Sequence, residues 1–78
     1  ELLNIIGVKA SFVLTSYNNI IYFSARSIDE LNVQVIMEKF GGGGHLTMAA
    51  AQLRDISLGE AKQQLKDVLQ KMHEEGDI

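Results

Sequence analysis

The most constraining feature of this chain is a run of four glycines, Gly41–Gly44, which follows Phe40 and ends at His45. Each glycine loses more backbone freedom on folding than an alanine would, about 0.4–1 kcal/mol per position. A chain of 78 residues has little stability to lose. We therefore expect the run to serve a purpose that side chains would obstruct, and close approach of backbone N–H groups to an anionic ligand is the usual one. The alternative is a flexible tether, but the run lacks the serine, proline or charge that linkers usually carry.

Composition places the chain among small globular domains. Apolar residues make up 46% of it, which is too many for a disordered segment. The absence of cysteine excludes disulfides and thiolate metal sites. A net charge of −3 gives no general attraction to nucleic acid, so any recognition of phosphate must be local. The chain starts at Glu1 instead of methionine, and we expect residues 1–78 to be a single domain excised from a longer protein.

An antiparallel hairpin is expected near the N-terminus. Apolar and polar side chains alternate from Val8 to Thr15, which is the period of a half-buried strand. Ser16–Asn19 has turn chemistry, because asparagine tolerates left-handed conformations. Ile20–Ala25 is rich in β-branched and aromatic residues and should form the second strand.

A helix should follow the hairpin and lead to the glycine run. Its start is open, because Ser27 and Asn32 can each act as the N-cap. Gly41 supplies the stop signal. The apolar side chains at helical spacing are Val33, Ile36, Met37 and Phe40.

Beyond the glycine run we expect further helices and one more strand. The alanine-rich segment Leu46–Ala51 suits a short helix whose N-terminus is the glycine run, and Gln52–Ile56 is a candidate strand. Ser57–Glu60 is a capping box that opens the last helix, which should reach about Glu74. The elements predict an α/β fold of the α+β kind. In it, two to three helices pack a small sheet, and the glycine-rich loop lies between helices.

Phosphate recognition is the chemistry that the glycine run favours. A glycine loop that enters a helix presents unpaired N–H groups at the positive end of the helix dipole. The backbone of Gly42, Gly43 and Gly44 is therefore a candidate binding element. His45 could donate a hydrogen bond to a phosphate or a base or act as a general acid, or it could only cap the helix or pack under the loop. The spacing fits neither a Walker motif nor the dinucleotide fingerprint.

Arg26 is the candidate cation of the same site. It lies at the end of the second predicted strand and suits bidentate contacts to phosphate, and Ser24 and Ser27 could add hydroxyl donors. Alternatively, Arg26 pairs with Asp29 or Glu30. Neither the acidic residues nor the two histidines have the spacing of an acid/base pair or a metal site, so we expect no catalytic group and no metal in this chain. Three other cations are expected to be solvated: Lys9, Lys39 and Arg54.

The motifs together resemble a known family. Four segments resemble the DHH-associated domain found at the C-terminus of DHH phosphoesterases. They are Ser24–Ser27, Asn32-Val33, Phe40–His45 and, after these, Ala49-Ala50. The resemblance covers roughly residues 7–72, and its most specific motif is GGGGH. The amino-acid sequence of this stretch is similar to that of the GdpP-type cyclic di-AMP phosphodiesterases of Gram-positive bacteria. Met48–Ala51 stands where many members carry Asn-Ala-Ala-Gly.

The resemblance implies a nucleotide-binding role shared with an upstream domain. In that family a DHH domain holds two manganese ions and activates a water for phosphodiester hydrolysis, while the associated domain grips the nucleotide. By resemblance, Ser24, Arg26 and Ser27 contact phosphate, and the Gly42–Gly44 backbone and His45 hold phosphate or base. The implied parent is membrane-anchored and degrades cyclic di-AMP to pApA, with this domain in the cytoplasm and not in contact with the membrane. The chain alone is expected to be inactive and to bind no cofactor.

Two alternatives stay open. RecJ-like exonucleases and oligoribonucleases carry a looser form of the pattern and act on short oligonucleotides or single strands. In a different class, the domain is a structural module in which the last helix, Leu58–Met72, mediates a homodimer and the glycine run is a hinge. The apolar stripe of that helix is also what a helix covering its own sheet would carry.

Overall fold

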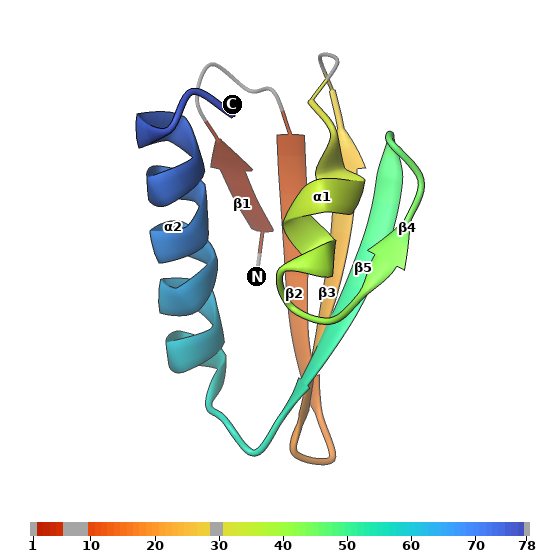
Figure 1. The fold of residues 1–78 in the computed structure, drawn as a ribbon. Helices are drawn as coiled ribbons and strands as arrows, with labels where there is room; N and C mark the ends of the chain where they lie inside the picture. The colour runs from red at the N-terminus through yellow and green to blue at the C-terminus, as the bar shows by residue number, and fades with distance from the viewer. Residues whose placement is uncertain (1, 6–9, 29–30, 78) are drawn as a thin grey trace.

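In the computed structural model, the described residues form one antiparallel sheet of five strands with two helices on one of its faces (Figure 1). The structure describes residues 2–5, 10–28 and 31–77. The strand order is β1-β2-β3-β5-β4, which confirms the predicted α+β class. The elements are β1 (Leu2–Ile5), β2 (Ala10–Tyr17), β3 (Ile20–Ser27), α1 (Val33–Glu38), β4 (Gly43–Gly44), β5 (Met48–Arg54) and α2 (Leu58–Glu74).

The predicted hairpin is formed by β2 and β3. Its turn is Asn18-Asn19, with φ angles of 50° and 61°, the conformation that a two-residue turn between twisted strands requires. The prediction started the first strand at Val8, but residues 6–9 lie outside the described residues. Strand β1, which pairs with β2 at the sheet edge, was not anticipated because its four residues show no regular alternation of apolar and polar side chains.

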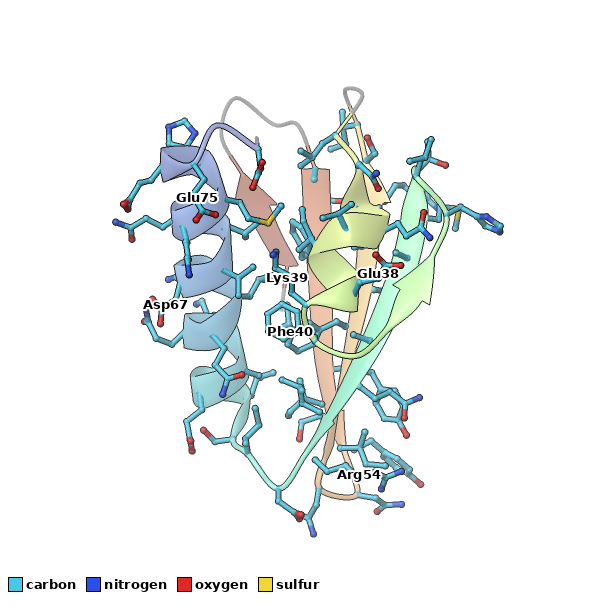
Figure 2. All side chains as sticks on the ribbon, in the orientation of Figure 1. Glu38, Lys39, Phe40, Arg54, Asp67 and Glu75 are labelled. Atoms are coloured by element: carbon cyan, nitrogen blue, oxygen red, sulfur yellow. The ribbon has the colours of Figure 1, made fainter. Side chains whose placement is uncertain are left out.

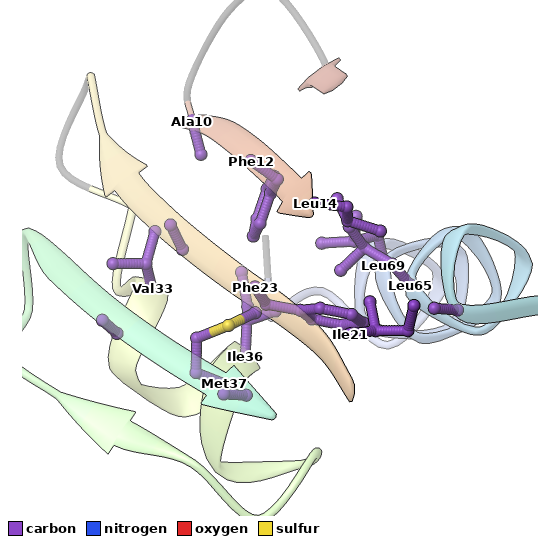
Figure 3. Packing of buried hydrophobic residues seen from close by; sticks show 14 of the residues in the cluster. Ala10, Phe12, Leu14, Ile21, Phe23, Val33, Ile36, Met37, Leu65 and Leu69 are labelled. Atoms are coloured by element: carbon purple, nitrogen blue, oxygen red, sulfur yellow. The ribbon is translucent and has the colours of Figure 1, made fainter. Parts of the chain in front are cut away.

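Alternation along the central strands places one face of the sheet in the core. Phe12 on β2 and Phe23 on β3 are at most 1% exposed. Helix α1 contributes Ile36 to the same core and α2 contributes Leu65, so both helices cover this one face (Figure 3). The opposite face carries the exposed residues of the strands and has no helix over it among the described residues.

Both helices begin at side-chain caps that the sequence contains. The Asn32 side chain accepts a hydrogen bond of 3.3 Å from the Val35 N–H, and Asn32 is therefore the N-cap of α1. The alternative cap, Ser27, is wrong because Ser27 is the last residue of β3. Ser57 caps α2, since its hydroxyl accepts from the Glu60 N–H and donates to the Glu60 carboxylate, each at 3.1 Å.

The helix predicted for Leu46–Ala51 is wrong. This segment contains a loop and the first half of β5, which also starts four residues before the predicted strand Gln52–Ile56. Ala49 and Ala51 are buried and Ala50 is exposed, which is the alternation of a strand. The helix propensity of alanine is a weak preference, and pairing with β3 and β4 overrides it.

Helix α2 follows the prediction closely and ends at Glu74. Most of its apolar stripe is buried within this single chain, with Leu58 and Val68 half-buried, so the stripe contributes to the core. The buried residues of the stripe are Ala61, Leu65, Leu69 and Met72.

Neither helix of the described chain has the length and apolar character needed to cross a membrane.

Removing the Leu65 side chain should destabilise the monomer. We expect Leu65→Ala to lower the free energy of unfolding by about 2–5 kcal/mol, because it leaves a cavity in the core. Urea unfolding measures this change, and Leu46→Ala is the control, since Leu46 is 59% exposed and its loss should change stability by less than ~0.5 kcal/mol. Unchanged stability together with loss of a dimer in sedimentation would contradict the assignment of Leu65 to the core.

Candidate functional site

The glycine run leaves the C-terminal end of α1 and leads into the β4–β5 hairpin. The prediction that it opens a helix, with the helix dipole adding positive charge, is therefore wrong: the run begins at the negative end of α1. Gly41 has a φ of +79°, and the N–H groups of Gly41 and Gly42 donate to the carbonyls of Glu38 and Met37. This is a Schellman ending, and it confirms Gly41 as the stop signal.

Close backbone contact with β5 explains two more of the glycines. A Cβ atom on Gly42 would collide with the carbonyl oxygen of Ala50 and lie 2.7 Å from the Cα of Ala51. A Cβ atom on Gly44 would lie 2.5 Å from the Cα of Ala49, and its φ of +148° also disfavours a side chain. The expected close approach is therefore made by the neighbouring strand of the protein itself, because the backbone of Gly42 packs against β5.

Gly43 is the exception in the run. A Cβ atom there would have no heavy atom within 4 Å, and its φ is not in the left-handed region. Gly43 pairs with Ala50, which in turn pairs with Ser24 on β3. These three small residues lie in one row across the sheet and line a shallow depression of about 270 Å³ together with Gly44 and Met48. The fold therefore does not require glycine at position 43, whereas close approach of a ligand would.

Arg26 stands on the same open face as this depression. Ser24 and Arg26 are both exposed, and alternation along β3 puts them on the face that the helices do not cover. Arg26 pairs with Met48, one of the residues that line the depression. Within the part of the chain that the structure describes, the Arg26 side chain makes no hydrogen bond or ion pair. Its alternative partners, Asp29 and Glu30, lie outside the described residues.

The loop of the β4–β5 hairpin holds His45 at the rim of the depression. The His45 N–H donates to the Met48 carbonyl at 2.7 Å, so His45 lies opposite Met48 and in the same cross-strand row as Arg26. His45 and Arg26 lie on either side of Met48, so two strand-to-strand spacings separate their backbones, roughly 10 Å. The side chain of His45 is exposed and does not cap a helix, which removes that alternative.

Ser27 lies next to this site and belongs to a different depression. Its N–H donates to the Thr47 carbonyl at 2.8 Å, which ties the end of β3 to the hairpin loop. Ser27 is half-buried and lines a mainly apolar hollow with Leu31, Asn32 and Leu46. The structure therefore brings together Ser24, Arg26, Gly43 and Gly44, with His45 at the rim. Met48 and Ala50 were missed as lining residues, because the segment was expected to be helical.

Helix α1 holds the hairpin at both of its ends. The Gly42 N–H donates to the Met37 carbonyl at the C-terminal end of α1, and the Val33 N–H at the other end donates to the Leu46 carbonyl at 3.1 Å. Residues 42–46 therefore run alongside the helix, and β4 is fixed in place. These hydrogen bonds favour a fixed loop over the alternative in which the glycine run is a hinge.

Comparison with known proteins identifies the family. The DHHA1 domain matches residues 1–75. The chain belongs to the DHHA1 domain family. This assignment confirms the resemblance drawn from the GGGGH motif and the Ser24–Ser27 segment.

The relatives of this DHHA1 domain include cyclic-di-AMP phosphodiesterases, of which two are described here. It is 53% identical over 76 residues to the cyclic-di-AMP phosphodiesterase GdpP of Geobacillus thermodenitrificans, covering 96% of this chain and 12% of the relative. It is 55% identical over 65 residues to the cyclic-di-AMP phosphodiesterase PdeA of Listeria monocytogenes, covering 82% and 10%. A 50-residue stretch is 42% identical to the A-adding tRNA nucleotidyltransferase of Geobacter sulfurreducens, covering 63% and 6%. The chain thus spans about a tenth of the length of the two phosphodiesterases.

Alanine substitutions should separate the two kinds of glycine in this DHHA1 domain. Gly42→Ala should lower the free energy of unfolding by more than about 1 kcal/mol, because its Cβ has no room against β5. Gly43→Ala should keep the stability or raise it by ~0.4–1 kcal/mol, because it restricts the unfolded chain without a clash. Urea unfolding of both variants is the measurement. Equal losses at the two positions would contradict the difference described here.

Proposed function

We propose that this DHHA1 domain grips the nucleotide for a metal-dependent phosphodiesterase that hydrolyses cyclic di-AMP to pApA. The observation that carries the proposal is an exposed Arg26, without an ion-pair partner among the described residues, beside a depression with a floor of Gly43 and Ala50. Support comes also from the two cyclic-di-AMP phosphodiesterases to which the chain is 53% and 55% identical.

Each part of the depression would have a separate task in binding. The Arg26 guanidinium would pair with a phosphate, and the Ser24 hydroxyl would add a donor to it. Gly43 would let the ribose or the phosphate approach the backbone of β4, because no side chain stands over it. Met48 is 53% exposed and would offer an apolar surface to a base. His45 would donate to phosphate or base from the rim.

The proposal assigns catalysis to another domain of the parent protein. Among the described residues, no group of three or more His, Cys, Asp or Glu side chains is placed to hold a metal ion. We propose that a DHH domain of the parent supplies the manganese and the groups that act with it. The parent would be anchored in a membrane and would keep this domain in the cytoplasm. Cleavage of cyclic di-AMP by the isolated chain with manganese would contradict the assignment of catalysis to a separate domain.

Arg26→Ala should weaken the binding of cyclic di-AMP and pApA. The expected loss is about tenfold or more, because a charged contact to phosphate is removed. Isothermal titration calorimetry measures the affinity, and Lys66→Ala is the control, since it removes one exposed positive charge on α2. An Arg26→Ala variant that keeps its fold and its affinity would remove Arg26 from the site.

The same titration separates the proposed substrate from single strands. If cyclic di-AMP and pApA bind more tightly than longer oligoadenylates, the cyclic di-AMP assignment is supported. Affinity that rises with oligonucleotide length would instead favour a RecJ-like exonuclease or an oligoribonuclease.

A further inference from the structure

Strand β5 has an open edge next to the site described above. Strand β4 pairs with β5 only at Ala49 and Ala50, so among the described residues no strand lies beside the rest of that edge. The bond from the His45 N–H to the Met48 carbonyl marks a hydrogen-bonded pair, and such pairs alternate along an antiparallel ladder. The N–H and C=O groups of Gln52 therefore face the open edge and not β3. Gln52 thus presents backbone donors and acceptors as well as its side chain.

A second depression lies along this edge. It has a volume of about 450 Å³, and Gln52 and Arg54 are its polar side chains, opposite the backbone of Gly41 and Gly42. It shares the lining residue Ala50 with the first depression, so the two depressions are neighbours along β5. Figure 2 shows Arg54 at the lower end of β5, on the side of the sheet away from α2.

Alternation places this second group on the same open face as Arg26. Gln52 and Arg54 are both exposed, and within the described residues the Arg54 side chain has no hydrogen bond or ion pair. Gln52 pairs with Tyr22, which is half-buried on that face and lies one two-residue step, roughly 7 Å, from Ser24. A tyrosine ring on a sheet is a surface on which a base can stack, and an arginine beside it can bind a phosphate.

We propose that Tyr22, Gln52 and Arg54 form a second nucleotide subsite, which takes the other half of a dinucleotide whose first half lies at Ser24, Arg26 and Gly43. Arg54 binds a phosphate, the Gln52 amides donate to phosphate or base, and Tyr22 stacks on the base. This inference rests on the proposed function and extends it. Arg54, which the sequence alone predicts to be solvated, is here assigned a role in the specificity for two-nucleotide ligands.

Linear pApA and AMP test the subsite, since one has two nucleotides and the other has one. Calorimetry with the 78-residue chain should show that Arg54→Ala weakens pApA binding about tenfold and leaves AMP binding unchanged. Arg26→Ala should weaken the binding of both nucleotides. Lys66→Ala controls for the loss of one positive charge, and amide spectra check that each variant is folded.

Failure of the subsite and failure of the proposed function give different results. If Arg54→Ala leaves pApA binding unchanged, or weakens pApA and AMP equally, while Arg26→Ala weakens both, the second subsite is overturned and the proposed function stands. An equal loss of pApA affinity in Lys66→Ala also overturns the subsite, because the effect is then one of net charge. If neither nucleotide binds the unaltered chain, both proposals are overturned.

Discussion

The backbone of Gly42 lies against β5 so closely that no side chain fits between them, and the geometry of the site depends on this contact. The same residue bonds to the end of α1 through the Met37 carbonyl, while Leu46 bonds to the beginning of α1 through the Val33 N–H. Helix, edge strand and β5 are thereby fixed as one unit. Because α1 also contributes Ile36 and Met37 to the core, the position of the glycine run is set by the same packing that stabilises the domain.

In the described part of the chain, the helices cover one face of the sheet and leave the other face open. The chain carries a net charge of −3, so an anionic ligand needs cations placed locally. Arg26 and Arg54 both lie on the open face. Arg26, on β3, pairs with Met48 at the beginning of β5, whereas Arg54 is the last residue of β5. Between them lie Gly43, Ala50 and Ser24, whose small size lets a ligand approach the backbone. In the proposed function, recognition comes from side chains on the open face of the sheet and from an open backbone, and not from a helix N-terminus.

Some of this architecture follows from local sequence and some does not. The β2–β3 hairpin, the Asn32 and Ser57 caps and α2 were predicted because turn residues, capping side chains and apolar spacing are local signals. The Ala49–Ala51 segment was mistaken for a helix because alanine fits both structures, and only its pairing with β3 and β4 decides between them.

The candidate site was predicted in part for the same reason. Arg26 and Ser24 can be proposed as binding residues from the sequence, because they lie near the end of a predicted strand. In the structure both are exposed on the open face. The role of the glycines was only half anticipated, since close backbone approach was expected but its partner is β5. The sequence alone predicts a solvated Arg54, because the open edge of β5 beside Gln52 follows only from the strand order.

The most direct measurement is a map of amide chemical shifts in the isotope-labelled chain during titration with cyclic di-AMP. We expect selective shifts at Arg26, Gly43, Gly44 and Ala50, on the open face of the sheet, and unchanged amides on the exposed side of α2. Shifts confined to α2, or no shifts at millimolar nucleotide, would contradict the claim that this face grips the nucleotide.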